Sequence, residues 1–210
     1  MSMLQQGPLL ELLLSGQFVC AVTHETYYRQ LQDEALREAL NEYLRPLNRS
    51  VVLSADGAVF YLSWLQITPE LREQLGAHLQ EVYRSLLPLL EWMLLVQEIS
   101  GRDGVLTAGD VLQQTDMIQR CEDNPSLRDR LAKLAADRFF NSSSDDVTLQ
   151  VRQIFRRLVE HGYAIQPNAE RQTYRITGKM DYLMELVRFL KDEENLPIDE
   201  EVAVQEAIEL

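Results

Sequence analysis

The sequence predicts a mostly α-helical protein with small β-hairpins, an α+β fold in which one order of elements occurs twice. Apolar residues at helical spacing dominate the chain of 210 residues. Two pairs of short β-rich segments flank turn residues, one pair within 50–62 and the other within 163–176. Each pair directly follows an amphipathic helical segment. The chain therefore contains two similar units rather than one continuous bundle.

The first unit opens with a short helix and a short strand. Gly7–Leu14 has a Gly-Pro start followed by leucines, which indicates a buried helix. Phe18–Val22 is rich in residues that favour strands. Thr23 is then expected to cap the next helix.

A second helix and a hairpin complete this unit. Asp33–Leu44 places leucines three and four residues apart and ends before Pro46. The β-rich segments of Ser50–Leu62 flank Asp56-Gly57, the strongest short hairpin signal in this sequence. The pattern thus predicts a helix that leads directly into a two-stranded wing.

The middle of the chain is expected to form two helices. Pro69–Leu87 carries leucines on one stripe, and Pro88–Ile99 begins at a proline and ends before a Ser-Gly pair. These helices connect the units, and residues 88–100 would form the first helix of the second unit. No stretch is apolar over the roughly 20 residues needed to span a membrane.

The second unit repeats the order. Val105-Leu106 is a short apolar pair, and Thr107–Leu112 is expected to be helical. A further helix is predicted over Leu127–Phe139. Thr148–His161 is strongly amphipathic, with Gly162 where a helix C-cap belongs.

A second hairpin and a last helix follow. Tyr163–Ile176 contains two β-rich segments around a polar turn at Pro167-Asn168, and Met180–Leu190 is helical in pattern. Residues 191–210 carry one Lys and eight Asp or Glu, so this end is an acidic tail. The tail is either disordered or an amphipathic segment that orders on a partner.

Helix, short strand, helix, helix, hairpin is the order of a winged helix. We therefore expect tandem winged-helix domains joined by a long helix. The N-terminal winged helix would cover 1–68, the connecting helices 69–100, the C-terminal winged helix 101–194 and the acidic tail 195–210. Residue identity between the copies is slight, so the alternative is two unrelated α+β units.

The charge limits the function. The net charge of −13 gives the protein a field that repels nucleic acid and anionic lipid. Any DNA contact must therefore come from a local patch. One stretch between Gln150 and Met180 has six cations against two acids, a local charge of +4. The candidate DNA-binding residues are Arg152, Arg156, Arg157, Arg171, Arg175 and Lys179.

These cations lie on the elements that winged helices present to DNA, the helix before the wing and the wing itself. They would contact phosphates without reading sequence. The alternatives are a solvated face or a surface that docks an acidic segment. The corresponding helix of the first unit carries an acidic stripe of Glu34, Glu38 and Glu42, which indicates a protein-binding module.

The sequence predicts no enzyme. It lacks the common phosphate-loop, nucleophile-elbow and zinc-protease motifs. His24, His78 and His161 fall in three different elements, and Cys20 and Cys121 lack metal-ligand spacing. We therefore expect no catalytic residues, no metal site, no cofactor and no disulfide.

Three segments resemble the MukE/MksE class of bacterial condensin subunits, the kleisin-interacting tandem winged-helix proteins. They are LREALNEYLRPLNRSVVLSADGAVFYL, VRQIFRRLVEHGYAIQPNAERQTYRIT and the lead-in LLELLLSGQFVCAVTHETYYRQL. The resemblance covers residues 7–190, and the size and acidic tail favour MksE. It has no short signature or catalytic motif to match.

The resemblance implies a non-catalytic accessory subunit of an SMC–kleisin complex. Its partners would be a kleisin of the MksF or MukF type, an SMC ATPase of the MksB or MukB type and a second copy of itself, with DNA as a further contact. It would act in chromosome organisation and segregation or in plasmid defence, in the cytoplasm at the nucleoid and not at a membrane. The alternatives are a stand-alone winged-helix transcription regulator and an enzyme with an unseen motif.

Overall fold

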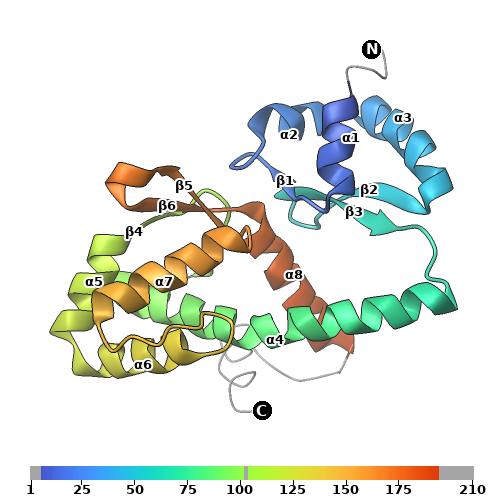
Figure 1. Cartoon of the computed structure of the whole chain (residues 1–210). Coiled ribbons are helices and arrows are strands. Elements are labelled where there is room, and N and C mark those ends of the chain that lie inside the picture. The colour runs from blue at the N-terminus through green and yellow to red at the C-terminus, as the bar shows by residue number, and fades with distance from the viewer. Residues whose placement is uncertain (1–5, 102–103, 194–210) are drawn as a thin grey trace.

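The structure is a computed structural model that describes residues 6–101 and 104–193. It is a mixed fold of α-helices and two small antiparallel sheets, in agreement with the predicted α+β class. Figure 1 shows an N-terminal half, from α1 to β3, beside a C-terminal half, from α4 to α8. The acidic tail predicted at 195–210 lies outside the described residues.

Within its described residues, the N-terminal half contains three α-helices, a 3-10 helix at Arg45–Leu47 and a three-stranded sheet. Its elements are α1 (Gly7–Leu14), β1 (Val19–Cys20), α2 (Glu25–Leu31), α3 (Glu34–Leu44), β2 (Arg49–Leu53) and β3 (Val59–Trp64). The strands are ordered β1-β3-β2. The hairpin turn is confirmed at Asp56-Gly57, where Gly57 has a φ of 74° and the Asp56 carboxylate accepts from the Ala58 N–H.

One cap prediction in this half is wrong. The residue that precedes α2 is His24 rather than Thr23, and its side chain makes no cap hydrogen bond. The Thr23 hydroxyl instead donates to the carbonyl of Phe18 at 3.2 Å. Because that hydroxyl holds the turn after β1, it is not available to the helix.

The predicted helix boundary at Pro88 is also wrong. A single helix, α4 (Pro69–Ser100), runs through it. Pro88 removes one helical N–H, a cost of about 3 kcal/mol. Buried side chains on the same stretch offset this cost, because Leu89, Leu90 and Trp92 are fully buried. Among the described residues, no helix is both long enough and apolar enough to cross a membrane.

The C-terminal half repeats the strand order and, in the part of the chain that the structure describes, has five α-helices, of which α4 is the first. Its further elements are β4 (Val111–Gln113), α5 (Gln114–Asp123), α6 (Pro125–Ala136), α7 (Val147–Glu160), β5 (Ala164–Asn168), β6 (Thr173–Ile176) and α8 (Gly178–Glu193). The sheet is ordered β4-β6-β5. The helix predicted over Leu127–Phe139 and the amphipathic helix over Thr148–His161 are confirmed within a few residues as α6 and α7.

The prediction between residues 105 and 112 is wrong. The apolar pair Val105-Leu106 has the place of the short strand in the repeated order, but it forms no strand. The expected helix over Thr107–Leu112 is a turn followed by β4. Val111 pairs with Arg175 of β6, far along the chain. Because the pairing strand lies so far along the chain, the residues around Val111 carry no sequence pattern that predicts a strand.

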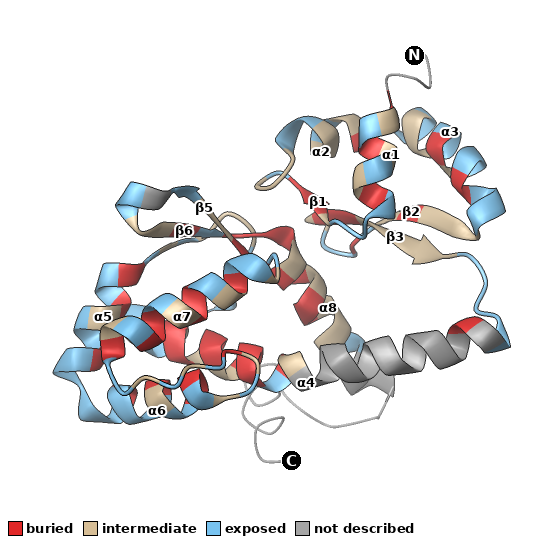
Figure 2. Ribbon diagram, in the orientation of Figure 1, coloured by how far each residue is buried: buried red, intermediate tan, exposed pale blue. Residues whose placement is uncertain are grey.

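Each half has its own buried cluster (Figure 2). The N-terminal cluster joins α1, α3 and the sheet around Leu9, Leu40 and Phe60. The larger C-terminal cluster includes Trp92 and Phe155, and it joins the second part of α4 to α5, α6, α7, β6 and the start of α8.

The halves meet where α8 begins. The backbone N–H of Gly178 lies 3.3 Å from the Cys20 sulfur, which accepts its hydrogen bond. The ring of Tyr182 lies 5.0 Å from that of Phe18 and 4.8 Å from that of Tyr61. Further along α8, the Glu185 carboxylate accepts from the Ala55 N–H. These contacts fix the N-terminal sheet against α8.

Candidate nucleic-acid interface

The helix α7 carries the first of the candidate arginines, and local signals define it. The Asp146 carboxylate accepts from the Leu149 N–H at 2.8 Å and caps the N-terminus. Gly162 follows the helix with a φ of 75°, a conformation that favours glycine. The apolar stripe, which includes Ile154 and Phe155, faces the core. The opposite face is thereby left to charged residues.

Arg152 and Arg156 lie one helical turn apart on this exposed face. Arg156 contacts Glu160 at 3.5 Å, and its side chain remains 62% exposed. Arg152 lies close enough to Tyr174 to oppose the rise that burial causes in the pKa of that phenol. Both guanidinium groups can therefore reach a ligand on the α7 surface.

Arg157 has a different environment. Its Nε donates to the Phe139 carbonyl at 2.8 Å, and its Nη1 donates to Glu160 at 2.9 Å. Its side chain is only 27% exposed. These bonds tie the segment before α7 to the helix, so Arg157 has a structural role in addition to any ligand contact.

The structure separates the two arginines of the second hairpin. Arg171 is exposed in a short 3-10 turn, Ala169–Arg171, at the tip between β5 and β6. Arg175 is exposed on β6, next to the buried Tyr174. Because side chains alternate along a strand, Arg175 faces away from α7 while Tyr174 stacks on Phe155. The candidate residues thus do not form one continuous patch.

Lys179 lies at the junction of the halves. Its ammonium group donates to the His161 carbonyl at 2.8 Å and lies 5.6 Å from the Phe18 ring and 4.8 Å from the Tyr163 ring. Burial lowers its pKa. This residue is therefore engaged within the protein, and sequence spacing alone could not show that.

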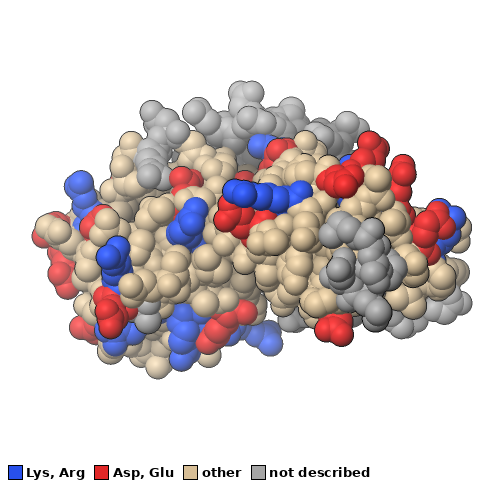
Figure 3. All heavy atoms as spheres, turned by 90° about the horizontal axis from the view of Figure 1, so that it is seen from above, with Lys and Arg blue, Asp and Glu red and all other residues tan. Residues whose placement is uncertain are grey.

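Charges of both signs alternate over the face seen from above (Figure 3). On α3, Glu34, Glu38 and Glu42 are all at least partly exposed, so the predicted acidic stripe is present on that helix. Arg45 contacts Glu42 at 2.9 Å at the end of the stripe. The helices before the two hairpins, α3 and α7, therefore present opposite charge.

The titratable side chains offer no assembled metal site within residues 6–101 and 104–193. Burial lowers the pKa of His24, and a backbone contact with Phe18 partly opposes this. Burial also raises the pKa of the Cys121 thiol to about 11, which makes it a poor nucleophile at neutral pH. The side chain of His78 lies outside the described part of the chain.

A family model described as condensin complex protein MksE matches residues 5–188. No curated protein matches the chain. The family match spans both halves, from α1 to the second part of α8.

Proposed function

The chain belongs to the MksE family of condensin complex proteins, and from this premise we propose that it is a non-catalytic subunit that binds a kleisin and thereby joins an SMC-type ATPase. The observation that carries the proposal is the family match over residues 5–188. The complex would act in chromosome organisation and segregation or in plasmid defence. The subunit would work as a homodimer in the cytoplasm, at the nucleoid.

We propose further that each half is a winged helix. The identical strand orders, β1-β3-β2 and β4-β6-β5, support this, as does the helix that precedes each hairpin. The domains would span 1–68 and 101–194, with 69–100 between them. In the C-terminal domain, α7 would take the place of the helix that enters a DNA groove.

Assembly tests the proposed function. We expect the chain, coexpressed with the kleisin and the SMC ATPase of its own host, to co-elute with both in size-exclusion chromatography. The kleisin alone should suffice to retain the chain, because the proposed contact is with that subunit. Elution of the chain without either protein, with specific binding of short operator-like DNA, would instead favour a transcription regulator.

DNA contact is proposed through the exposed face of α7. We expect the double substitution Arg152→Glu and Arg156→Glu to weaken binding of a DNA duplex by about 10-fold or more at low salt. Removing each phosphate-binding cation should also reduce the salt dependence of binding by roughly one power of salt concentration. Fluorescence anisotropy at several salt concentrations measures both. Arg157 stays unchanged, since its bonds to Phe139 and Glu160 are structural.

The matched control changes two arginines of the N-terminal half, Arg29→Glu and Arg45→Glu. Both are exposed, and each contacts a glutamate on its own helical segment. The overall charge changes equally in the two double variants, so a general electrostatic effect would weaken DNA binding equally in both. That result would contradict a specific role for α7.

A further inference from the structure

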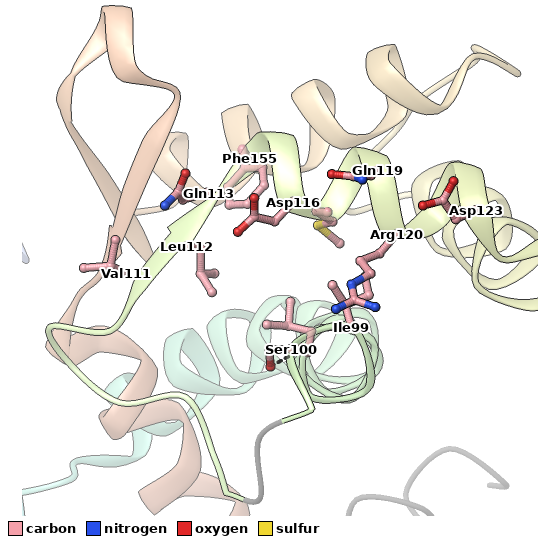
Figure 4. A pocket seen from close by; sticks show the side chains of 12 residues that line it. Ile99, Ser100, Val111, Leu112, Gln113, Asp116, Gln119, Arg120, Asp123 and Phe155 are labelled. Carbon is pink, nitrogen blue, oxygen red and sulfur yellow. Dashed lines mark hydrogen bonds between the residues drawn. The ribbon is translucent and has the colours of Figure 1, made fainter.

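A groove lies between the end of α4, β4 and α5. Figure 4 shows β4 along one side, α5 along another and the last turn of α4 below. Its volume is about 650 Å³, within the range of pockets that bind ligands. Ile99, Leu112, Met117 and Phe155 supply apolar lining.

One side of the groove is the open edge of a sheet. In the order β4-β6-β5, β4 has a strand neighbour on one side only among the described residues. The Asp110 carbonyl accepts from the Ile176 N–H, and the Gln114 N–H donates to the Gln172 carbonyl. Antiparallel pairing alternates, so the N–H groups of Val111 and Gln113 point away from β6. The side chains of both residues are exposed.

The charges of the groove favour a basic ligand. Asp116 and Asp123 line it from α5, together with one cation, Arg120. The remaining polar lining consists of neutral groups such as Gln113 and Gln119. A bound segment that extends along β4 would thus place apolar side chains over Leu112 and Ile99. On the α5 side, its basic side chains would lie near the carboxylates of the groove, which outnumber the one cation there.

We propose that this groove binds an extended segment of the kleisin, which adds as a strand to the free edge of β4. The segment would carry apolar side chains at alternate positions and a Lys or Arg near Asp123. Strand addition of this kind takes its affinity from backbone hydrogen bonds and its specificity from pockets for alternate side chains. The inference rests on the proposed function, since it assigns a surface to the kleisin contact.

Labelled short peptides tiled along the kleisin provide the probe, with binding to the full chain measured by fluorescence anisotropy. Val111→Pro removes an N–H that makes no bond to β6, and proline is accepted on such edge positions. We expect it to weaken the best peptide by about 10-fold or more. Asp123→Lys should weaken it several-fold, and Leu149→Ala, at an exposed apolar residue of α7, should leave it unchanged.

Asp123→Lys provides a second variant in case Val111→Pro fails to fold. Asp123 is exposed in the last turn of α5, where a cation is favoured by the helix dipole. Equal peptide affinity in wild type, Val111→Pro and Asp123→Lys would contradict the proposal that the kleisin segment binds in this groove. Equal binding of intact kleisin to wild type and to both variants would also contradict the groove as the binding site. The proposed function would stand in that case, because the kleisin would still bind the chain. Failure of intact kleisin to bind wild type would contradict the proposed function itself.

Discussion

Gly178→Ala is expected to lower the free energy of unfolding by about 2 to 3 kcal/mol, within the range found when a packed core is overfilled. A Cβ at this position would lie 2.8 Å from the Cβ of Cys20, 2.9 Å from that of Val59 and 3.2 Å from the Ala58 carbonyl oxygen. Atoms so close to the backbone cannot rotate away. The N-terminal sheet would therefore have to move off the start of α8.

The expected loss of stability in Gly178→Ala is opposite in sign to the usual effect of this substitution in a helix. Within a helix, alanine is normally more favourable than glycine by about 1 kcal/mol. Gly7, at the start of α1, provides the matched control, since nothing lies within 4 Å of the Cβ that alanine would add. We expect Gly7→Ala to be neutral or slightly stabilising. Urea denaturation followed by circular dichroism measures both variants.

The outcome bears on how the halves are joined. If Gly178→Ala matches the Gly7→Ala control, α8 and the N-terminal sheet can separate at little cost. The contacts of Tyr182 with Phe18 and Tyr61 would then be too weak to hold the halves in one arrangement.

The sequence predicts well those elements whose signals are local. Asp146 and Gly162 mark the two ends of α7, and Asp56-Gly57 marks the first hairpin turn. Each depends only on residues within a few positions along the chain. Spacing also places Arg152 and Arg156 on one exposed face, as the structure has them.

Elements that depend on distant residues escape such prediction. The strand β4 exists because β6 pairs with it, and α4 continues through Pro88 because Leu86 and Leu89 beside it are buried in the core. A pattern of neighbouring residues therefore does not reveal the groove beside β4. Proximity in sequence likewise groups Lys179 with the arginines, yet its ammonium group is engaged at the junction, where the two halves pack together.

The junction of the halves also contains a buried carboxyl group, that of Asp181. The residue is 7% exposed, and its carboxylate accepts from the Ala108 N–H at 3.0 Å. Burial raises its pKa from 3.8 to about 6, the Ala108 hydrogen bond opposes the rise, and the nearby charges of Asp56 and Asp110 add to it. At neutral pH the folded protein thus holds a carboxylate that water would solvate better.

Asp181→Asn is accordingly expected to stabilise the protein at neutral pH, by about 1 to 2 kcal/mol. A raised pKa in the folded state contributes stability that is complete below the unfolded value of 3.8 and is lost as the pH rises through about 6. Each pKa unit corresponds to about 1.4 kcal/mol, and screening by solvent reduces the full difference. The amide oxygen can still accept from Ala108, so the hydrogen bond is kept.

The pH dependence identifies the cause. The gain from Asp181→Asn should grow between about pH 4 and pH 6, remain constant above about pH 7, and vanish well below about pH 4, where wild-type Asp181 is protonated in both states. Asp129→Asn, at an exposed position on α6, is the control variant. A loss of stability that is the same at every pH would contradict a buried charge. It would show instead that an asparagine side chain does not fit the junction, whatever the charge of Asp181.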